Sequence, residues 1–227
     1  MRSLLWLLPL ASLVGCESSK VEETTSEPHV LFSQPFPQFA TDEARFPARL
    51  RGTYLAVDDT TLQLCIDAHA VWAQHIAREV VSQQKLAEEE PDMRVFDSWQ
   101  TVKGVRYYLH RRADDSVAVS SILPDTLFHL PPGGAWHLRR FQGSGYLSHT
   151  NDPHWRLRRL VLTGNTLRLE KIAFDTLRLA ILPPGLLQRP NDSLGIDWVI
   201  GPATRKQVKL ITQSAGLWET LGEYRRR

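Results

Sequence analysis

Two histidines and an aspartate lie within one short segment of the chain, at His149, Asp152 and His154. Neutral imidazole and carboxylate groups are suitable ligands for Zn²⁺, and the same groups can serve a hydrolase as acid and base. A zinc site needs three or four converging ligands, however, and the sequence identifies no fourth one. Asn151-Asp152-Pro153 is also typical of a solvent-exposed turn. We therefore predict no metal and no cofactor, and keep a metal-binding protein or hydrolase that uses these three residues as the alternative.

Two other reactive side chains, Ser144 and Cys65, lack the surroundings that catalysis needs. Gly143-Ser144-Gly145 does not have the Gly-x-Ser-x-Gly spacing that exposes a nucleophile on a strained turn between a strand and a helix. Cys65 stands in the middle of an expected strand without a local catalytic motif, and free cysteines are mostly buried. No catalytic residue is therefore predicted, and a non-enzymatic protein is the first hypothesis.

Arginines gather in the second half of the chain. The set that we single out is Arg139, Arg140, Arg156, Arg158 and Arg159. One interpretation is a contact surface for anionic lipid headgroups or for a partner protein. The other is that these side chains are solvated on strand faces, where they protect sheet edges from pairing. The sequence favours the second interpretation.

A short apolar run from Leu4 to Val14 follows Arg2 and leads into Gly15-Cys16. It has the charged start and apolar middle of a signal peptide, and it is too short for a transmembrane helix, which needs about 20 apolar residues. Leu13-Val14-Gly15-Cys16 resembles the lipobox of bacterial lipoproteins, in which the cysteine is diacylated, the chain is cut before it and the new N-terminus is acylated. The resemblance implies a signal peptide over residues 1–15 and a lipid anchor at Cys16. An ordinary cleaved signal peptide with an incidental cysteine is the alternative.

The lipobox resemblance also implies a location in the bacterial cell envelope. Lipoproteins with a residue other than Asp after the cysteine are usually directed to the outer membrane, so Glu17 leads us to expect the outer membrane, with its periplasmic and surface faces both open. Without Arg2, the only charge in residues 1–15, 26 basic side chains remain against 25 acidic ones. This near neutrality gives no field that would favour nucleic acid. With Cys16 committed to lipid, Cys65 has no partner for a disulfide within the chain.

From residue 46 onward the hydrophobic pattern has a period of two, which is typical of strands. The clearest hairpin joins 155–163 to 166–170 through a Gly164-Asn165 turn, and another joins 52–57 to 60–66. Further strands are expected at 94–99, 105–110, 116–122, 126–130, 145–148 and 196–200, with breaks at 114–115, 124–125 and 131–134. The prediction is a mainly β protein whose antiparallel meanders form an open barrel or a sandwich, followed by a short C-terminal helix over 204–214.

The chain divides into three parts. Residues 1–15 form the signal peptide, 16–45 hold the lipidated cysteine, a polar disordered tether and an extended segment rich in Pro and Phe, and 46–227 form the β-rich body. The extended segment is expected to lay its phenylalanines on the body. Leu50 to Leu55 recurs with insertions as Leu138 to Leu147. We therefore consider two similar meanders, 46–135 and 136–227, with chance similarity between hairpins as the alternative.

The run Phe46-Pro47-Ala48-Arg49-Leu50-Arg51-Gly52-Thr53-Tyr54 resembles a motif of an uncharacterised lipoprotein family of Bacteroidota, Phe-Pro-x-x-Leu-x-Gly-x-Tyr. The family runs from a lipobox through this motif into a β-meander, and its stretch matching residues 70–81 is strand-like. Residues 67–90 fit a helix or a strand by pattern alone, so the resemblance leads us to predict a strand through Val81 and a short helix over 82–89. It brings no catalytic residue, ligand or partner.

The first hypothesis for function is a membrane-anchored envelope lipoprotein that acts as a non-catalytic interaction or small-ligand-binding module. Its expected partners are the membrane, other envelope proteins or anionic lipids, and not nucleic acid. The many tryptophans could line an apolar cavity or fill the core. A cavity lined by aromatics would favour ligand binding, and converging titratable groups in a cleft would favour catalysis. A solid core without a cleft would favour a structural or assembly role.

Overall fold

The structure is a computed structural model, and it describes residues 29–89, 99–102, 105–112, 114–130, 135–151, 153–189 and 198–227. The predicted signal peptide, Cys16 and the tether up to residue 28 lie outside the described residues. So do Asp152, the predicted break at 131–134, most of the strand expected at 94–99 and the start of the strand expected at 196–200.

The described strands form one large sheet in which only the β1–β13 pairing is parallel. The main path has the order β12-β13-β1-β10-β11-β14-β2-β3-β4-β7-β6-β5, and β9 also pairs with β10 and carries β8 at its other edge. The prediction of a mainly β, antiparallel protein is confirmed, and the sheet is not closed into a barrel. The bounds are β1 (Val30–Phe32), β2 (Gly52–Ala56), β3 (Leu62–Ile66), β4 (Ala70–Ser82), β5 (Trp99–Val102), β6 (Val105–Arg111), β7 (Ser116–His129), β8 (Trp136–Phe141), β9 (Ser144–Asn151), β10 (His154–Thr163), β11 (Thr166–Ile172), β12 (Leu187–Gln188), β13 (Trp198–Ile200) and β14 (Trp218–Arg226).

In the described part of the chain, three short α-helices accompany the sheet: α1 (Gln83–Glu89), α2 (Thr176–Leu179) and α3 (Arg205–Gln213). The predicted C-terminal helix is confirmed as α3. It begins in a capping box, in which the Thr204 hydroxyl accepts the N–H of Gln207 and the Gln207 side chain returns to the backbone of Thr204. The strand and short helix predicted between 70 and 89 are confirmed as β4 and α1.

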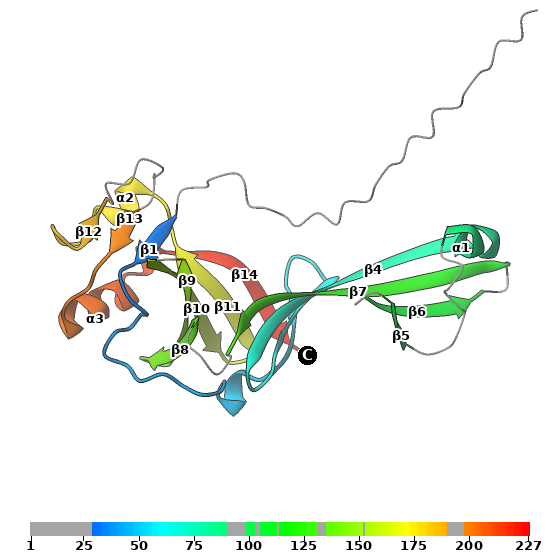
Figure 1. The fold of residues 1–227 in the computed structure, drawn as a ribbon, viewed down its shortest axis with the longest axis horizontal. Coiled ribbons are helices and arrows are strands. Elements are labelled where there is room, and N and C mark those ends of the chain that lie inside the picture. Colours follow the sequence, from blue (N-terminus) through cyan, green and yellow to red (C-terminus); the bar gives the residue numbers. More distant parts are fainter. Residues whose placement is uncertain are drawn as a thin grey trace, which may run out of the picture.

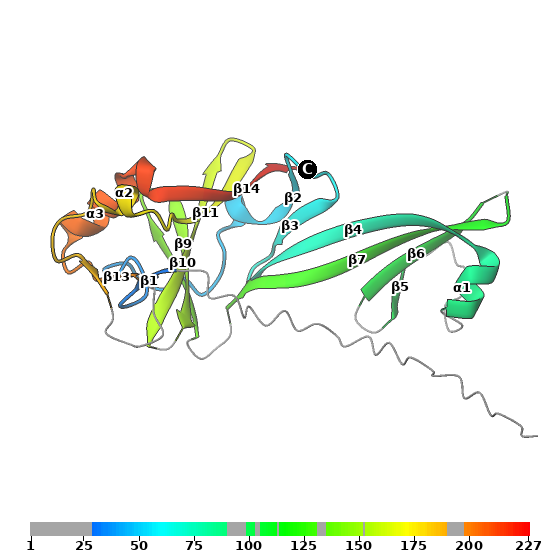
Figure 2. The ribbon, with the colours of Figure 1, turned by 90° about the horizontal axis from the view of Figure 1, so that it is seen from above.

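The molecule consists of a body and a projecting arm. Figure 1 shows β4 and β7 leaving the body as a long hairpin that carries β5, β6 and α1, and Figure 2 shows the same projection from above. We call β4, β5, β6, β7 and α1 the arm, and the other described elements the body. β4 has 13 residues and β7 has 14, so each strand is more than about 40 Å long at about 3.3 Å per residue.

The body buries apolar side chains on both faces of its sheet. On one face Leu138 and Leu160 pack with Phe46, Tyr54 and Phe128 among others. On the other face a second cluster is covered by the N-terminal segment and by α2 and α3. Its buried members include Phe32, Phe36, Tyr146, Leu157, Leu179, Ile200, Val208, Ile211 and Trp218. The structure buries Phe32 and Phe36 of the Pro- and Phe-rich segment against the body, as predicted, whereas Phe39 is largely exposed.

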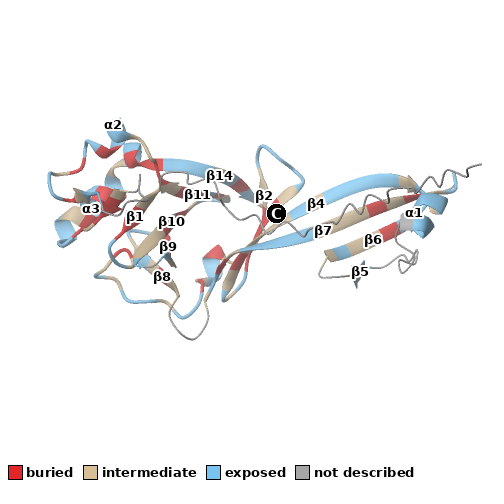
Figure 3. Cartoon of the chain, turned by 45° about the horizontal axis from the view of Figure 1, so that its top comes forward, coloured by how far each residue is buried: buried red, intermediate tan, exposed pale blue. Residues whose placement is uncertain are grey.

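The arm has its own small core at its outer end. Leu86 of α1 packs there with Leu109, Val117 and Val119, which all lie on the same face of β6 and β7. Figure 3 shows that the middle of β4 and β7, between this core and the body, is mostly exposed or intermediate. The arm is thus a folded tip on a two-stranded stalk.

β7 corrects one prediction, because it runs without a break through Pro124 and Asp125. Pairing with β6 ends at Ile122, so that edge of β7 is free at Pro124. On the other edge Pro124 lies opposite Gln74. The N–H of Ile76 donates to Thr61 and therefore points away from β7. Gln74 lies two residues earlier in β4, so its N–H points the same way, and Gln74 and Pro124 form a pair without hydrogen bonds between them. A proline costs no ladder hydrogen bond at such a position.

Four strands of the body were not predicted as strands, namely the short β1 and β12 and the longer β8 and β14. β14 lies between β11 and β2, so it joins strands from the two halves of the sequence in one sheet. Its Gly222 is weak strand sequence but is required by packing, because a Cβ there would come within 2.7 Å of the Tyr224 hydroxyl.

Candidate functional site

The segment with His149 and His154 forms the adjoining ends of β9 and β10. The His149 ring stacks on Trp136 of β8, with centroids 3.8 Å apart and planes at 25°. Asp152 lies outside the described residues. Within the described ranges, no three His, Cys, Asp or Glu side chains come together as a metal ion would require. The metal or hydrolase hypothesis for His149, Asp152 and His154 therefore gains no support and stays a prediction.

Burial lowers the pKa of His149, and the positive charges of Arg156 and Arg158 lower it further. An unfolded histidine titrates near pH 6.5, so the unfolded chain takes up this proton at a higher pH than the folded one. The neutral, folded His149 therefore makes its full contribution to the free energy of unfolding above about pH 6.5. This contribution is lost as the pH falls through the lower pKa that His149 has in the folded chain. His149→Phe keeps an aromatic ring against Trp136 but cannot take up a proton. We expect its free energy of unfolding to fall less between about pH 7.5 and pH 5 than that of the unchanged protein. Urea unfolding of both chains at about pH 7.5 and pH 5 measures it, and an identical pH dependence would contradict it.

Arg139 does not fit the predicted headgroup or partner contact. Its Nε donates to Asp42 over 2.6 Å, and its Nη1 donates to the carbonyl oxygen of Pro35 over 2.6 Å. Burial raises the pKa of the Asp42 carboxyl, but hydrogen bonds from Arg139 and His137 outweigh this and hold the pKa below its usual value. Arg139 therefore fastens the N-terminal segment to β8.

Arg159 corrects the same prediction more strongly, because it is buried. Its Nε lies 2.6 Å and its Nη2 2.5 Å from Glu170 Oε2, and its Nη1 donates to the carbonyl oxygen of Thr212 over 3.0 Å. The guanidinium carbon also lies 3.8 Å from the ring centroid of Trp218. Arg159 thus links β10, β11, α3 and β14 inside the body and is unavailable to a membrane surface.

The other three arginines of the predicted contact reach the surface to different extents. Arg158 and Arg140 are exposed, and Arg140 lies 4.0 Å from Glu43. Arg156 is half-buried beside His149. A headgroup or partner contact by these three stays a prediction, whereas Arg139 and Arg159 are removed from it.

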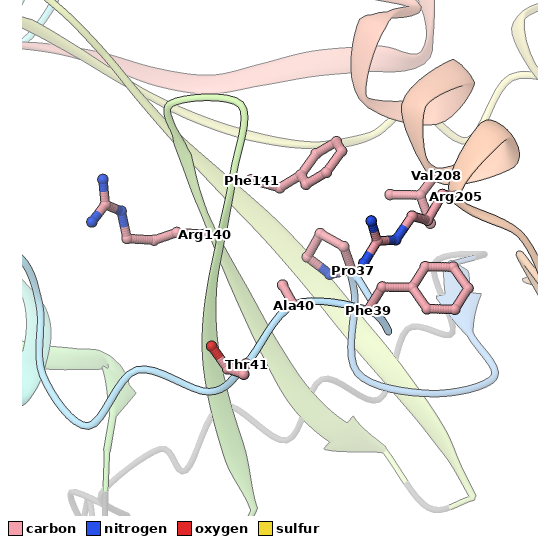
Figure 4. A pocket seen from close by; sticks show the side chains of 8 residues that line it. All are labelled: Pro37, Phe39, Ala40, Thr41, Arg140, Phe141, Arg205 and Val208. Atoms are coloured by element: carbon pink, nitrogen blue, oxygen red, sulfur yellow. The ribbon is translucent and has the colours of Figure 1, made fainter.

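A pocket of about 350 Å³ lies between the N-terminal segment, β8 and α3. Figure 4 shows Pro37, Phe39, Phe141 and Arg205 turned toward one another, whereas the Arg140 side chain extends to the other side of β8. No tryptophan lines this pocket, and its lining includes no carboxylate or imidazole that could exchange a proton. It is therefore a small apolar hollow with one cation turned into it, not the aromatic cavity that the tryptophans could have formed.

The two reactive side chains also lie in structural positions. Cys65 is buried in β3, where its thiol lies 3.4 Å from the amide oxygen of Gln74, and burial raises its pKa. Ser144 begins β9 directly after the turn at Gln142 and Gly143. A thiol with a raised pKa is a poor nucleophile, so Cys65 packs as a small buried residue.

The arm presents a surface that the sequence analysis did not identify. Residues opposite each other in a ladder share a face, and the register places Trp99, Arg106 and Tyr108 on the same face as Ile76 and Ile122. The other face is covered by α1 and by the small core of Leu86, Leu109, Val117 and Val119, which we call the tip core. Val80 extends the first face and is 54% exposed, and Trp99 is 43% exposed. We call this surface, formed by Ile76, Val80, Trp99, Arg106, Tyr108 and Ile122, the open face of the arm.

Three side chains of the open face contact one another. The rings of Trp99 and Tyr108 have centroids 5.6 Å apart, and the Arg106 guanidinium carbon lies 5.4 Å from the Trp99 ring. These contacts hold the exposed Trp99 and Arg106 in place against the half-buried Tyr108. One feature of the sequence points to this surface. The stretches 70–82 and 116–129 are unusually long for strands, and each carries apolar residues that would lie on both faces of a strand.

Comparison with protein-family models, with curated proteins and with solved structures finds no match for the chain. The resemblance to a Bacteroidota lipoprotein family therefore stays a prediction. None of the helices in the described part of the chain is both long and apolar enough to cross a bilayer.

Proposed function

We propose that this protein is a lipid-anchored protein of the bacterial envelope, in the outer membrane, that acts as a non-catalytic interaction module and binds a partner protein through the open face of its arm. The observation that carries the proposal is the cluster on the projecting arm in which the exposed Trp99 and Arg106 contact each other and Trp99 packs on the half-buried Tyr108. Acylation of Cys16 would hold the body at the membrane, and the arm would then reach the partner.

The chemistry of the open face supports a protein partner. Tryptophan, tyrosine and arginine are the residues that contribute most often to binding energy at protein interfaces. Here they occur together, and the apolar side chains of Ile76, Val80 and Ile122 continue the surface along the stalk. Exposed apolar surface with a polar rim is typical of an interaction site. Arg78, which lies between Ile76 and Val80 on the same face, supplies part of that rim.

The shape of the arm supports the same function. A two-stranded stalk that is exposed in its middle adds little apolar burial to the fold, and an isolated hairpin is marginally stable. The tip nevertheless has a core of its own, which keeps the open face ordered far from the body. An ordered surface at a distance from the membrane is what a tethered interaction module needs.

Site-specific photo-crosslinking in intact cells tests the proposal. We expect p-benzoylphenylalanine at Val80 or Trp99 to give the same discrete adduct with an envelope protein. The matched control is Leu123, which lies on the other face of the arm and is 59% exposed, similar to Val80 at 54%. The control position is expected to give no such adduct.

Two results would contradict the proposal. One is the absence of adducts from Val80 and Trp99, and the other is an equal adduct from Leu123. Metabolic labelling with a fatty acid in parallel tests the anchor, since incorporation should be lost in Cys16→Ser. If the unchanged chain does not incorporate the fatty acid, the proposed lipid anchor is wrong. The crosslinks still test the proposed contact of the arm, because they do not depend on the fatty acid.

A further inference from the structure

Positive charge is segregated at the end of the body opposite the arm. Figure 1 shows α2, α3, β12 and β13 at this end. The described ranges 29–41, 176–189 and 198–218 contain no aspartate or glutamate. They carry five cations, namely Arg178, Arg189, Arg205, Lys206 and Lys209. Four acids directly flank these ranges in the sequence, namely Asp42, Asp175, Asp197 and Glu219. Of these, Asp175 pairs with Arg178 over 3.6 Å and Asp42 pairs with Arg139 over 2.6 Å. Because the whole chain has a net charge of only +2, this surface, which we call the basic end, is a local concentration of positive charge.

Large aliphatic side chains are exposed on the same surface. Leu177 is 82% exposed and Ile181 is 50% exposed. The helical turn of α2 continues through Ile181, whose N–H donates to the carbonyl oxygen of Arg178, so the two residues lie one turn apart on the outer side. Leu179 and Leu182 point the other way, into the core. An exposure of this size leaves Leu177 without a packing partner in the body.

α3 repeats this arrangement of apolar and basic residues. Val208 and Ile211 are buried, whereas Lys206, Leu210 and Gln213 follow one another along the outer side at spacings of four and three residues. A shallow groove of about 490 Å³ runs beside them and is lined by Pro183, Thr204, Lys206, Gln207, Lys209, Leu210 and Gln213. An exposed leucine beside lysines on the outer side is typical of a helix that lies in a membrane interface.

The described chain also begins at the basic end. The carbonyl oxygen of His29 accepts the N–H of Trp198 over 3.0 Å, and the Arg189 guanidinium carbon lies 4.4 Å from the Trp198 ring. Residues 17–28 can span at most about 40 Å when fully extended. If Cys16 is acylated, as proposed above, the basic end is therefore the part of the body that the anchor brings to the bilayer.

We propose that the basic end docks on a membrane surface rich in anionic phospholipid headgroups, with Leu177 and Ile181 entering the interface and Lys206 and Lys209 contacting phosphates. A protein partner fits this surface less well, because lysine is depleted at protein interfaces. Docking at this end orients the molecule, because the arm points away from the basic end and so away from the bilayer.

An environment-sensitive fluorophore on a single introduced cysteine tests the docking. The full chain carries Cys16→Ala, and Cys65 is buried, so Leu177→Cys creates the one accessible thiol. With vesicles of 70% phosphatidylcholine and 30% phosphatidylglycerol, we expect the emission of the probe at 177 to shift to shorter wavelength. The same probe at Leu123→Cys on the arm is the matched control and is expected not to shift.

Charge and self-association are tested with the same probe. In the Lys206→Gln/Lys209→Gln background we expect the lipid concentration for a half-maximal shift to rise about tenfold, since each lysine near an anionic surface contributes to attraction. No shift at 177, equal shifts at 177 and 123, or a shift that follows protein concentration without vesicles would each overturn the proposal. Because Cys16 is absent from these chains, the result is independent of whether the natural chain is acylated.

Discussion

Replacing Arg159 by methionine is expected to lower the free energy of unfolding by about 3–5 kcal/mol, which is the usual cost of removing one partner of a buried ion pair. The loss is large because Glu170 is itself buried and receives two guanidinium nitrogens within 2.6 Å. Arg168 also lies near Glu170, 3.5 Å from Oε1, but it is half-exposed and cannot replace the buried guanidinium. The Thr212 carbonyl and the Trp218 ring would lose their contacts with the guanidinium as well.

Denaturant unfolding with two control variants separates the causes. Arg168→Met removes the exposed partner of the same carboxylate and should cost less than about 1 kcal/mol, as surface pairs do. Arg159→Met/Glu170→Leu removes both buried charges and should recover most of the loss, because the penalty comes from the orphaned carboxylate. A loss from Arg159→Met no larger than that from Arg168→Met would show that the pair does not hold the body together.

The sequence placed Arg159 among surface arginines for a physical reason. Strand alternation tells which residues share a face, but not whether a second layer covers that face. In β10 the face of Leu160 was recognisable as core, and the structure confirms the hairpin of β10 with β11. The face of Leu157 and Arg159 is covered by α3 and the N-terminal segment, which come from the two ends of the described chain. Local patterns contain no information about such a distant cover.

In the arm, too, local sequence patterns predict the strands but not how the strands pair or where they lie. β4, β6 and most of β7 were predicted as strands, because their composition and alternation are local properties. The pairing of β4 with β7, and its continuation beyond β3, depend on contacts between residues distant in the chain, from Ser82 with Ser116 to Ala70 with His129. The open face follows from this register alone, since Trp99, Tyr108 and Ile122 come from three different strands. Their residue types were visible in the sequence, but their common face was not.

The basic end is not recognisable from the balance of charges over the whole chain. Near neutrality hid a segregation that appears only when α2, α3 and β13 are placed side by side at one end. The arginine cluster that was conspicuous in the sequence is instead divided between structural pairs and the strand surface. Proximity in the sequence is therefore a weaker guide to a charged surface than proximity in the fold.

The arm is expected to unfold separately from the body when Leu109 is replaced by alanine. Leu109 is fully buried and has few partners in the tip core, chiefly Leu86, Val117 and Val119. Leu→Ala substitutions in cores cost about 2–5 kcal/mol, which is large against the small apolar area that this core buries. The exposed middle of the stalk carries little coupling to the body, so the loss should remain local.

Hydrogen exchange measured by mass spectrometry distinguishes local from global unfolding. In Leu109→Ala, amides of β6, α1 and the outer half of β7 should lose protection, whereas those of β10 and β11 should keep it. Leu123→Ala on the neighbouring strand β7 is the matched control, and because Leu123 is 59% exposed it should leave both regions unchanged. Equal loss of protection in the arm and the body would show that the two unfold as one unit. A local loss should also abolish the crosslink from Trp99, because the open face is ordered by the core on the other side of the same strands.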